Sequence, residues 1–116
     1  MPAIPTVLVV APDGELRRSI AFVLEAEGLG VVCLDSLPVP GFAARFACAV
    51  VDEAAVGGDF DAVLALQPPV IMLIDRLRRL PERLAAWAIE KPLLGNRLVA
   101  AVGKALGYGG SAAVTA

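Results

Sequence analysis

Short runs of apolar residues recur along the chain, and polar or turn-forming residues separate them. Four runs are continuous enough to be buried strands: residues 6–10 (TVLVV), 31–34 (VVCL), 46–51 (FACAVV) and 69–74 (PVIMLI). A fifth and shorter run covers residues 88–90. Strands that read as unbroken apolar runs, without polar alternation, are typical of sheets covered on both faces. The pattern therefore predicts a buried parallel sheet.

Between the first two runs, residues 14–27 have the spacing of an amphipathic helix. Asp13 stands at the N-cap position, and Gly28 stands where a left-handed residue would end the helix. The face predicted to turn toward the core carries Leu16, Ile20, Val23, Leu24 and Glu27.

The helices that follow are predicted to be short. Pro38 and Pro40 delay a second helix until at least Gly41, because proline and the residue before it resist helical geometry. Residues 59–66 allow about two helical turns, capped by Asp59. Pro81 is well placed to begin another short helix that reaches residue 87.

The last helix is predicted to follow Asn96 as its N-cap, to turn three apolar residues inward and to end at Gly107. The three are Leu98, Val102 and Leu106. Strands that alternate with helices predict an α/β fold with right-handed crossovers, in which function lies at the carboxyl ends of the strands. The candidate residues at these ends are Ala11, Pro12, Asp13, Asp52, Glu53, Asp75 and Lys91.

The length of 116 residues predicts one domain, which we place at residues 1–107. Residues 108–116 are rich in Gly, Ser and Ala and are predicted to form a flexible tail or linker. A composition of 58% hydrophobic and 19% charged residues excludes intrinsic disorder. Polar residues interrupt every apolar stretch before it reaches membrane-spanning length, and residues 1–10 lack the basic residues of a secretory signal, so we expect a cytoplasmic protein.

The charged residues and the cysteines argue against several functions. Ten basic and twelve acidic residues give a net charge of −2, which provides no cationic field for direct nucleic-acid binding. Without histidine the chain lacks the usual base for Ser-His or Cys-His catalysis, and we expect no enzymatic activity. Cys33 and Cys48 lack CxxC spacing, so we expect two buried, reduced thiols.

Several of these segments resemble the receiver domain of response regulators, the CheY-like family, over residues 6–107. The segment VLVVAPDGELRRSIAFVLEAEGLGV is similar to the family's first strand and helix, and PVIML resembles its fourth strand. AVVD places Asp52 at the phosphoacceptor aspartate, and EKP places Lys91 at the lysine before proline. The resemblance implies a doubly wound, five-stranded parallel sheet in the order 2-1-3-4-5, here with shortened helices 2, 3 and 4. That order separates Cys33 from Cys48 by the first strand, which makes a disulfide between them implausible.

The resemblance also implies a chemistry for the site. In the family, an acidic pair after the first strand binds Mg²⁺ together with the phosphoacceptor. Here that pair reads Ala11-Pro12, and Ile74 replaces the threonine or serine that normally bonds the phosphoryl group. We therefore expect a divergent receiver in which Mg²⁺ binding is weak, with Asp52 and Asp13 as its candidate ligands.

The segment after the fourth strand contains a basic cluster and a set of candidate interface residues. The cluster consists of Arg76, Arg78, Arg79 and Arg83. It is either a docking surface for an acidic partner or the solvated edge of a short helix. Trp87, Leu77 and Leu80 are the candidate interface residues, since their place resembles the surface that receivers use to dimerise.

Together these features predict an atypical receiver domain of two-component (phosphorelay) signal transduction that works through protein contacts, with Asp52 as candidate phosphoacceptor and Lys91 beside it. The expected partners are a histidine kinase or another signalling protein, a second copy of the chain, and an effector domain after Ala116. Contacts with nucleic acid or membrane are not expected. The alternative is a phosphorylation-independent interaction or dimerisation module, a pseudo-receiver. A third reading is a flavodoxin-like domain that binds a small molecule.

Overall fold

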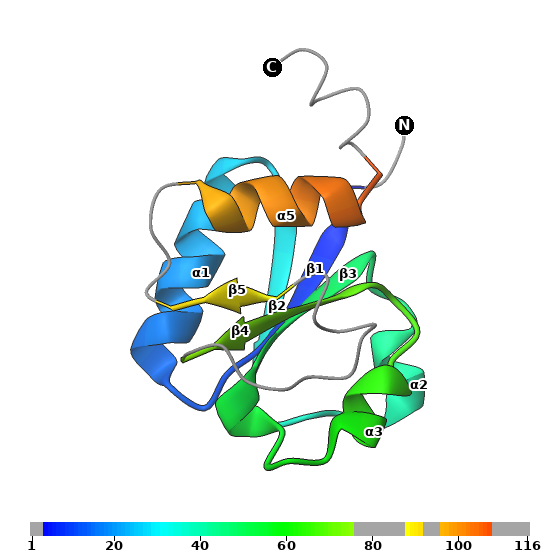
Figure 1. Ribbon diagram of the computed structural model, residues 1–116. Helices are drawn as coiled ribbons and strands as arrows, with labels where there is room; N and C mark the ends of the chain where they lie inside the picture. The colour runs from blue at the N-terminus through cyan, green and yellow to red at the C-terminus, as the bar shows by residue number, and fades with distance from the viewer. Residues whose placement is uncertain (1–3, 76–87, 92–95, 108–116) are drawn as a thin grey trace.

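Five parallel strands form one sheet at the centre of the computed structural model (Figure 1). The structure describes residues 4–75, 88–91 and 96–107. The strands follow the order β2-β1-β3-β4-β5, the doubly wound order that the resemblance to receivers implied. Their bounds are β1 Thr6–Val10, β2 Gly30–Leu34, β3 Cys48–Asp52, β4 Val70–Ile74 and β5 Ile89–Glu90.

Helices cover both faces of the sheet, as the unbroken apolar strands predicted. On one face lie α1 (Gly14–Ala26) and α5 (Arg97–Ala105), and on the other lie α2 (Pro40–Ala43) and α3 (Phe60–Leu64) (Figure 1). A 3-10 turn, η1 (Glu53–Ala55), follows β3. The second and third helices are as short as expected, whereas the helix predicted for residues 81–87 lies outside the described ranges. Within these ranges no helix is long and apolar enough to span a membrane.

Alternate residues of each central strand enter two separate hydrophobic clusters. In β1, Leu8 and Val10 pack with α2 and α3, whereas Val7 and Val9 pack with α1 and α5. All four side chains are fully buried. A strand with an apolar layer on each side has no solvent face, which explains why its sequence lacks polar alternation.

The predicted ends of α1 are confirmed to within one residue. Asp13 Oδ1 accepts hydrogen bonds from the backbone N–H groups of Glu15 and Leu16, at 2.9 and 3.4 Å. Gly28, just past the helix, has φ of 86°, a conformation that residues with a Cβ atom adopt rarely.

The predicted inward face of α1 is correct for Ile20 and Leu24, which are buried, and wrong for two other residues. Val23 is 39% exposed, and Glu27 is exposed as the C-cap of the helix. At 3.6 residues per turn, a stripe centred between Ile20 and Leu24 leaves Val23 at its margin. Glu27 stands where the helix ends, so helical spacing no longer decides its direction.

Two further boundaries differ from expectation, and one predicted cap stands in place without its hydrogen bond. β3 begins at Cys48 and not at Phe46, because the Phe46 N–H donates to the Ala43 carbonyl, 3.1 Å away, in the turn after α2. α2 begins at Pro40, one residue before Gly41, because proline at the first helical position breaks no hydrogen bond. Asn96 stands at the N-cap of α5, but its side chain makes no capping hydrogen bond.

The two cysteines have different environments. Cys48 is buried, and burial raises the pKa of its thiol from 9.0 to about 12. Cys33 is exposed on the edge strand β2, so the expectation of a buried thiol is wrong at this position. Both thiols are free, with β1 between their strands.

Candidate functional site

Asp52 is the last residue of β3, and it is almost fully buried, at 2% exposure. Its Oδ1 atom accepts a hydrogen bond of 2.8 Å from the backbone N–H of Ala54 and so caps η1. Carboxylates are favourable in this position because the first N–H groups of a helical turn have no partner inside the turn. The second oxygen, Oδ2, remains available for another partner.

Lys91 is that partner. It follows β5, and its backbone N–H donates to the carbonyl of Ile74 at 2.7 Å, which continues the β4–β5 pairing. Its Nζ atom lies 2.9 Å from Oδ2 of Asp52 and 3.1 Å from Oδ1 of Asp75. One ammonium group therefore joins the carboxyl ends of three neighbouring strands, β3, β4 and β5.

The Lys91 ammonium is held in its charged form. Partial burial by itself lowers the pKa of Lys91, but the hydrogen bonds and charges of Asp52 and Asp75 together outweigh that effect. Its pKa consequently lies above the ordinary value of 10.5. The site carries a permanent cation at neutral pH, and two carboxylates already share it.

Asp75 and Glu53 extend this network to the surface. The backbone N–H of Asp75 donates to Oε2 of Glu53 at 2.6 Å, which ties the residue after β3 to the residue after β4. The Asp75 side chain is 74% exposed, in contrast to Asp52. The ion pair of Lys91 with Asp75 is therefore screened by water, whereas the pair with Asp52 is largely protected from it.

The end of β1 contributes no ligand to the site. Ala11 is buried, Pro12 is exposed, and neither side chain can bind a cation. Arg17 Nη1 instead donates to the carbonyl oxygens of Ala11 and Pro12, at 2.6 and 3.0 Å. The Asp13 carboxylate, next in the chain, is directed at the N-terminus of α1.

These residues do not fit a magnesium site. Mg²⁺ prefers several oxygen ligands in octahedral geometry, with carboxylates carrying the charge. Within the described residues no group of three or more Asp, Glu, Cys or His side chains could hold a metal ion. Asp52 Oδ2 is paired with an ammonium group, and Asp13 is engaged as a helix cap. The chain's own cation, Lys91, thus stands beside the carboxylate that the resemblance places at the phosphoacceptor position.

Ile74, which the resemblance places at the switch hydroxyl, is 1% exposed and packs in the cluster on the α2 and α3 face. Ala88 is half-buried against the same cluster. The predicted interface residues Trp87, Leu77 and Leu80, and the basic cluster at residues 76–83, lie outside the described residues.

Two residues that the sequence pattern did not single out stand out in the structure, Arg17 and Phe22. Arg17 lies one turn into α1, where its guanidinium can reach back to the carbonyls before the helix. Phe22 is 74% exposed on α1. Its spacing of two residues from the buried Ile20 was a usable signal, because such a spacing puts side chains on different sides of a helix.

No protein-family model matches the chain. Among curated proteins, the transcriptional regulator protein FixT of Rhizobium meliloti (strain 1021) is 32% identical over 102 residues, which cover 84% of this chain and 89% of FixT. This level of identity over nearly the whole of both chains shows common family membership.

Solved structures share the fold. The chemotaxis protein CheY4 of Vibrio cholerae aligns with a TM-score of 0.66 and 20% identity, over 90% of this chain and 100% of that one. A response regulator from Thermotoga maritima gives a TM-score of 0.66 and 19% identity, over 90% and 99%. The N-terminal domain of a response regulator/sensory box/GGDEF 3-domain protein from Carboxydothermus hydrogenoformans gives 0.72 and 16%, over 93% and 98%. The chain therefore belongs to the family of FixT, and its fold is that of CheY-like response-regulator receiver domains.

Proposed function

We propose that this chain is an atypical receiver domain of a two-component system that acts through protein contacts and does not depend on phosphorylation of Asp52. One observation carries the proposal: Ala11 and Pro12, the residues after β1, offer no side-chain ligand for a metal ion beside Asp52. The relation to FixT, which is named as a transcriptional regulator, supports a role in the regulation of transcription.

The charge at the site explains why phosphorylation is disfavoured. Phosphorylation would replace the single negative charge of the Asp52 carboxylate by about 1.5 to 2 negative charges on the phosphoryl group, beside Asp75 and Glu53. Enzymes and receivers that handle such groups neutralise them with metal ions and with Arg or Lys. Among the described residues, Lys91 is the cation at Asp52, and it already serves two carboxylates.

The partners follow from the family and from the exposed surface. We propose a histidine kinase or another signalling protein as the partner of this cytoplasmic, non-enzymatic domain, with no direct contact to nucleic acid. Phe22, 74% exposed on α1, provides one apolar contact point. A homodimer through Trp87, Leu77 and Leu80 and an effector domain after Ala116 remain proposals from the sequence.

A second candidate function is acceptance of a phosphoryl group by Asp52. Asp52 and Lys91 stand at adjacent carboxyl ends of the sheet with 2.9 Å between their charged atoms, which is the pair that phosphoryl transfer in the family uses. In this case Asp52 would be the nucleophile and Lys91 would pair with the phosphoryl oxygens.

An NMR titration separates the two candidates. Amide spectra of the ¹⁵N-labelled chain are recorded with Mg²⁺ up to 20 mM and then with beryllofluoride, a phosphoryl mimic. We expect no saturable shift at Asp52, Glu53 or Lys91. Asp52→Asn is the site control, and Asp61→Asn, a change of an exposed acid on α3, is the matched surface control. Saturable shifts in the wild type and in Asp61→Asn, but not in Asp52→Asn, would instead establish a phosphoreceiver.

A further inference from the structure

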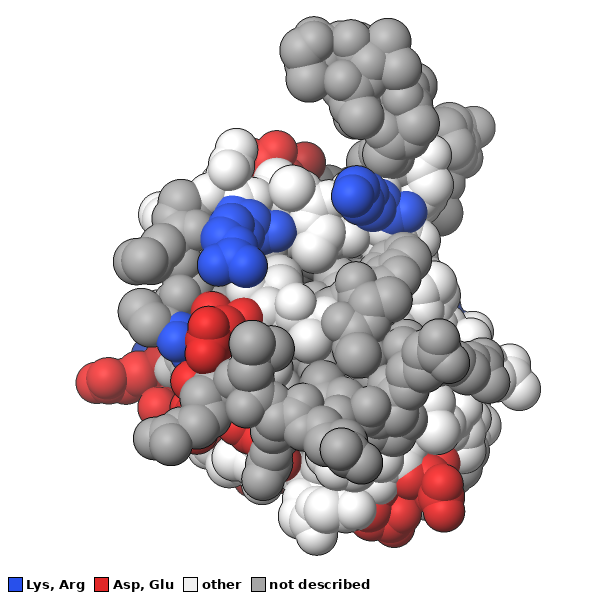
Figure 2. All heavy atoms as spheres, viewed as in Figure 1, with Lys and Arg blue, Asp and Glu red and all other residues white. Residues whose placement is uncertain are grey.

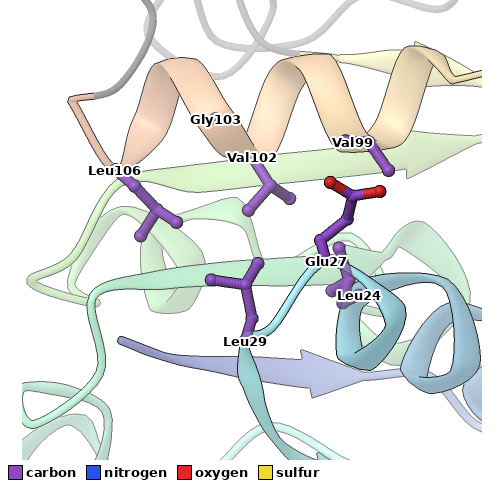
Figure 3. Close-up of a pocket in the computed structure, with 7 residues that line it drawn as sticks. All are labelled: Leu24, Glu27, Leu29, Val99, Val102, Gly103 and Leu106. Carbon is purple, nitrogen blue, oxygen red and sulfur yellow. The ribbon is translucent and has the colours of Figure 1, made fainter. Parts of the chain in front are cut away.

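A small groove lies between the C-terminal ends of α1 and α5, far along the sheet from Asp52 (Figure 3). Its volume is about 80 Å³. Leu24 from α1, Leu29 before β2, and Val102 and Leu106 from α5 form its apolar walls. Because Leu29 precedes β2 whereas Asp52 ends β3, the groove is at the amino ends of the strands and is separate from the site described above.

The glycine in this groove has no role in the fold itself. Gly103 lies inside α5, where glycine is unfavourable compared with alanine because it leaves the unfolded backbone more freedom. A Cβ atom added at Gly103 would meet nothing within 4 Å, and its φ is not in the left-handed region. Neither packing nor backbone geometry requires a glycine here, so its effect is to keep the groove open.

The single charged residue of the groove is also placed unfavourably. Glu27 is the C-cap of α1, where the negative end of the helix dipole repels an acid and favours a base. The last turn of α1 contains no basic residue. Glu27 forms no ion pair with any part of the chain that the structure describes. Figure 3 shows its carboxylate over the apolar walls, on the side of Val99.

Two locally unfavourable residues therefore meet at one groove, and natural sequences keep such choices mainly where function requires them. We propose that this groove binds a segment of a partner protein that presents a lysine or arginine next to an aliphatic side chain. The aliphatic group, or the methylene stem of the basic residue, fills the space above Gly103. The cationic head pairs with Glu27 and with the carbonyl end of α1.

The negative charge of Glu27 favours a basic partner segment over the chain's own C-terminal residues as the occupant of the groove. Residues 108–116 begin next to Leu106 but contain no lysine or arginine, so this tail cannot supply the cation that Glu27 lacks. On α5 itself the exposed cations are Arg97 and Lys104, and basic atoms are visible over this helix in Figure 2. Neither is paired with Glu27, which leaves its carboxylate available to a cation from another molecule.

The test uses a defined probe, a 14-residue amphipathic helical peptide of leucine and lysine, added to the ¹⁵N-labelled full chain. We expect saturable amide shifts at Glu27, Leu29 and Gly103. The affinity should fall at least fivefold in Glu27→Gln and be lost in Gly103→Leu, which fills the groove. Both variants should fold, because Glu27 is exposed and the space at Gly103 is open. The analogous leucine and glutamate peptide should not bind.

Matched controls isolate the groove from general electrostatics. Asp61→Asn, on the opposite face, and Asp52→Asn should each leave the affinity within about twofold. Shifts that centre elsewhere, or an affinity unchanged by Glu27→Gln and Gly103→Leu, would overturn the proposal. It is also overturned if removal of residues 108–116 shifts Gly103 without peptide, which identifies the tail as occupant. Dimerisation that Gly103→Leu abolishes would identify a second copy.

Discussion

Lys91 Nζ lies 2.9 Å from Oδ2 of Asp52, although 39 residues separate the two in the chain. The sheet order makes this contact: β4 stands between β3 and β5, and the lysine side chain crosses the end of β4 to reach the aspartate. On the way it meets Asp75, the residue after β4. The pair therefore fastens the carboxyl ends of three strands.

Replacement of Lys91 by methionine should destabilise the protein strongly. Met keeps the aliphatic stem but removes the ammonium, and Asp52 is left buried without its counter-charge. Breaking a fully buried ion pair costs about 3 to 5 kcal/mol. Because Lys91 is partly exposed, we expect the free energy of unfolding to fall by less, about 2 to 3 kcal/mol. Urea unfolding followed by circular dichroism measures it.

Asp75→Asn is the matched comparison for that variant. It removes the second carboxylate of Lys91, but this carboxylate is 74% exposed, so we expect a loss of at most about 1 kcal/mol. Equal losses for Lys91→Met and Asp75→Asn would contradict the assignment of Asp52 as the principal partner of Lys91.

Asp13 should contribute to stability as a helix cap and not as a metal ligand. Asp13→Ala removes the acceptor for the N–H groups of Glu15 and Leu16 and should cost about 1 kcal/mol. Asp13→Ser keeps a capping oxygen and should stay close to wild type. Any weak response of the amide spectrum to Mg²⁺ should be the same in Asp13→Ala and wild type. A specific loss of Mg²⁺ response in Asp13→Ala would instead make Asp13 a ligand.

Stability should fall as the pH rises above about 9. The pKa of Cys48 is raised from 9.0 to about 12 by burial, so the unfolded chain releases this proton before the folded protein does. Between these two pKa values, each pH unit can lower the free energy of unfolding by up to about 1.4 kcal/mol. The contribution of Lys91 to stability is lost only at higher pH, because its raised pKa keeps that contribution intact until the pH passes 10.5.

The control for this pH dependence is Cys48→Ala, which lacks the buried thiol. Unfolding in urea at a series of pH values from 7 to 10.5 should give a decline that is flatter in Cys48→Ala than in wild type. Cys33→Ala, which removes the exposed thiol, should keep most of the wild-type decline. Parallel curves for Cys48→Ala and wild type would show that another group causes the alkaline loss.

Carboxylates restored after β1 should create Mg²⁺ binding. Val10 pairs with Val51 in the sheet register, so an acid at position 11 would stand beside Asp52. The double variant Ala11→Asp, Pro12→Asp should be less stable than wild type without metal, because position 11 is buried. Addition of 10 mM Mg²⁺ should raise its unfolding midpoint while that of the wild type stays constant. No gain in the double variant would mean that Ala11 and Pro12 are not what prevents metal binding.

Much of the fold could be predicted from local pattern. The run TVLVV corresponds to β1 without error, and Asp13 and Gly28 mark the ends of α1 because capping depends on the chemistry of single residues. The errors share a cause. Phe46 lies in the turn before β3, Val23 lies at the margin of the buried stripe of α1, and Cys33 lies on the edge strand β2, so an apolar side chain alone did not decide burial there.

The candidate site divides in the same way. Asp52 and Lys91 were recognisable because each follows an apolar run, and parallel strands bring their carboxyl ends to one edge. The sequence did not reveal that Asp52 and Asp75 share the Lys91 ammonium group. That contact depends on which strands are neighbours and on how far one side chain reaches across them.

Residue type and spacing were therefore enough to predict the strands, the helices on both faces of the sheet, the absence of acids at positions 11 and 12, and the presence of Asp52 and Lys91 at strand ends. Only the tertiary structure decided that Arg17 binds the carbonyls after β1 and that Glu27 and Gly103 meet at one groove. Distances between side chains of different elements follow from sheet order, helix packing and rotamers, which no local spacing specifies.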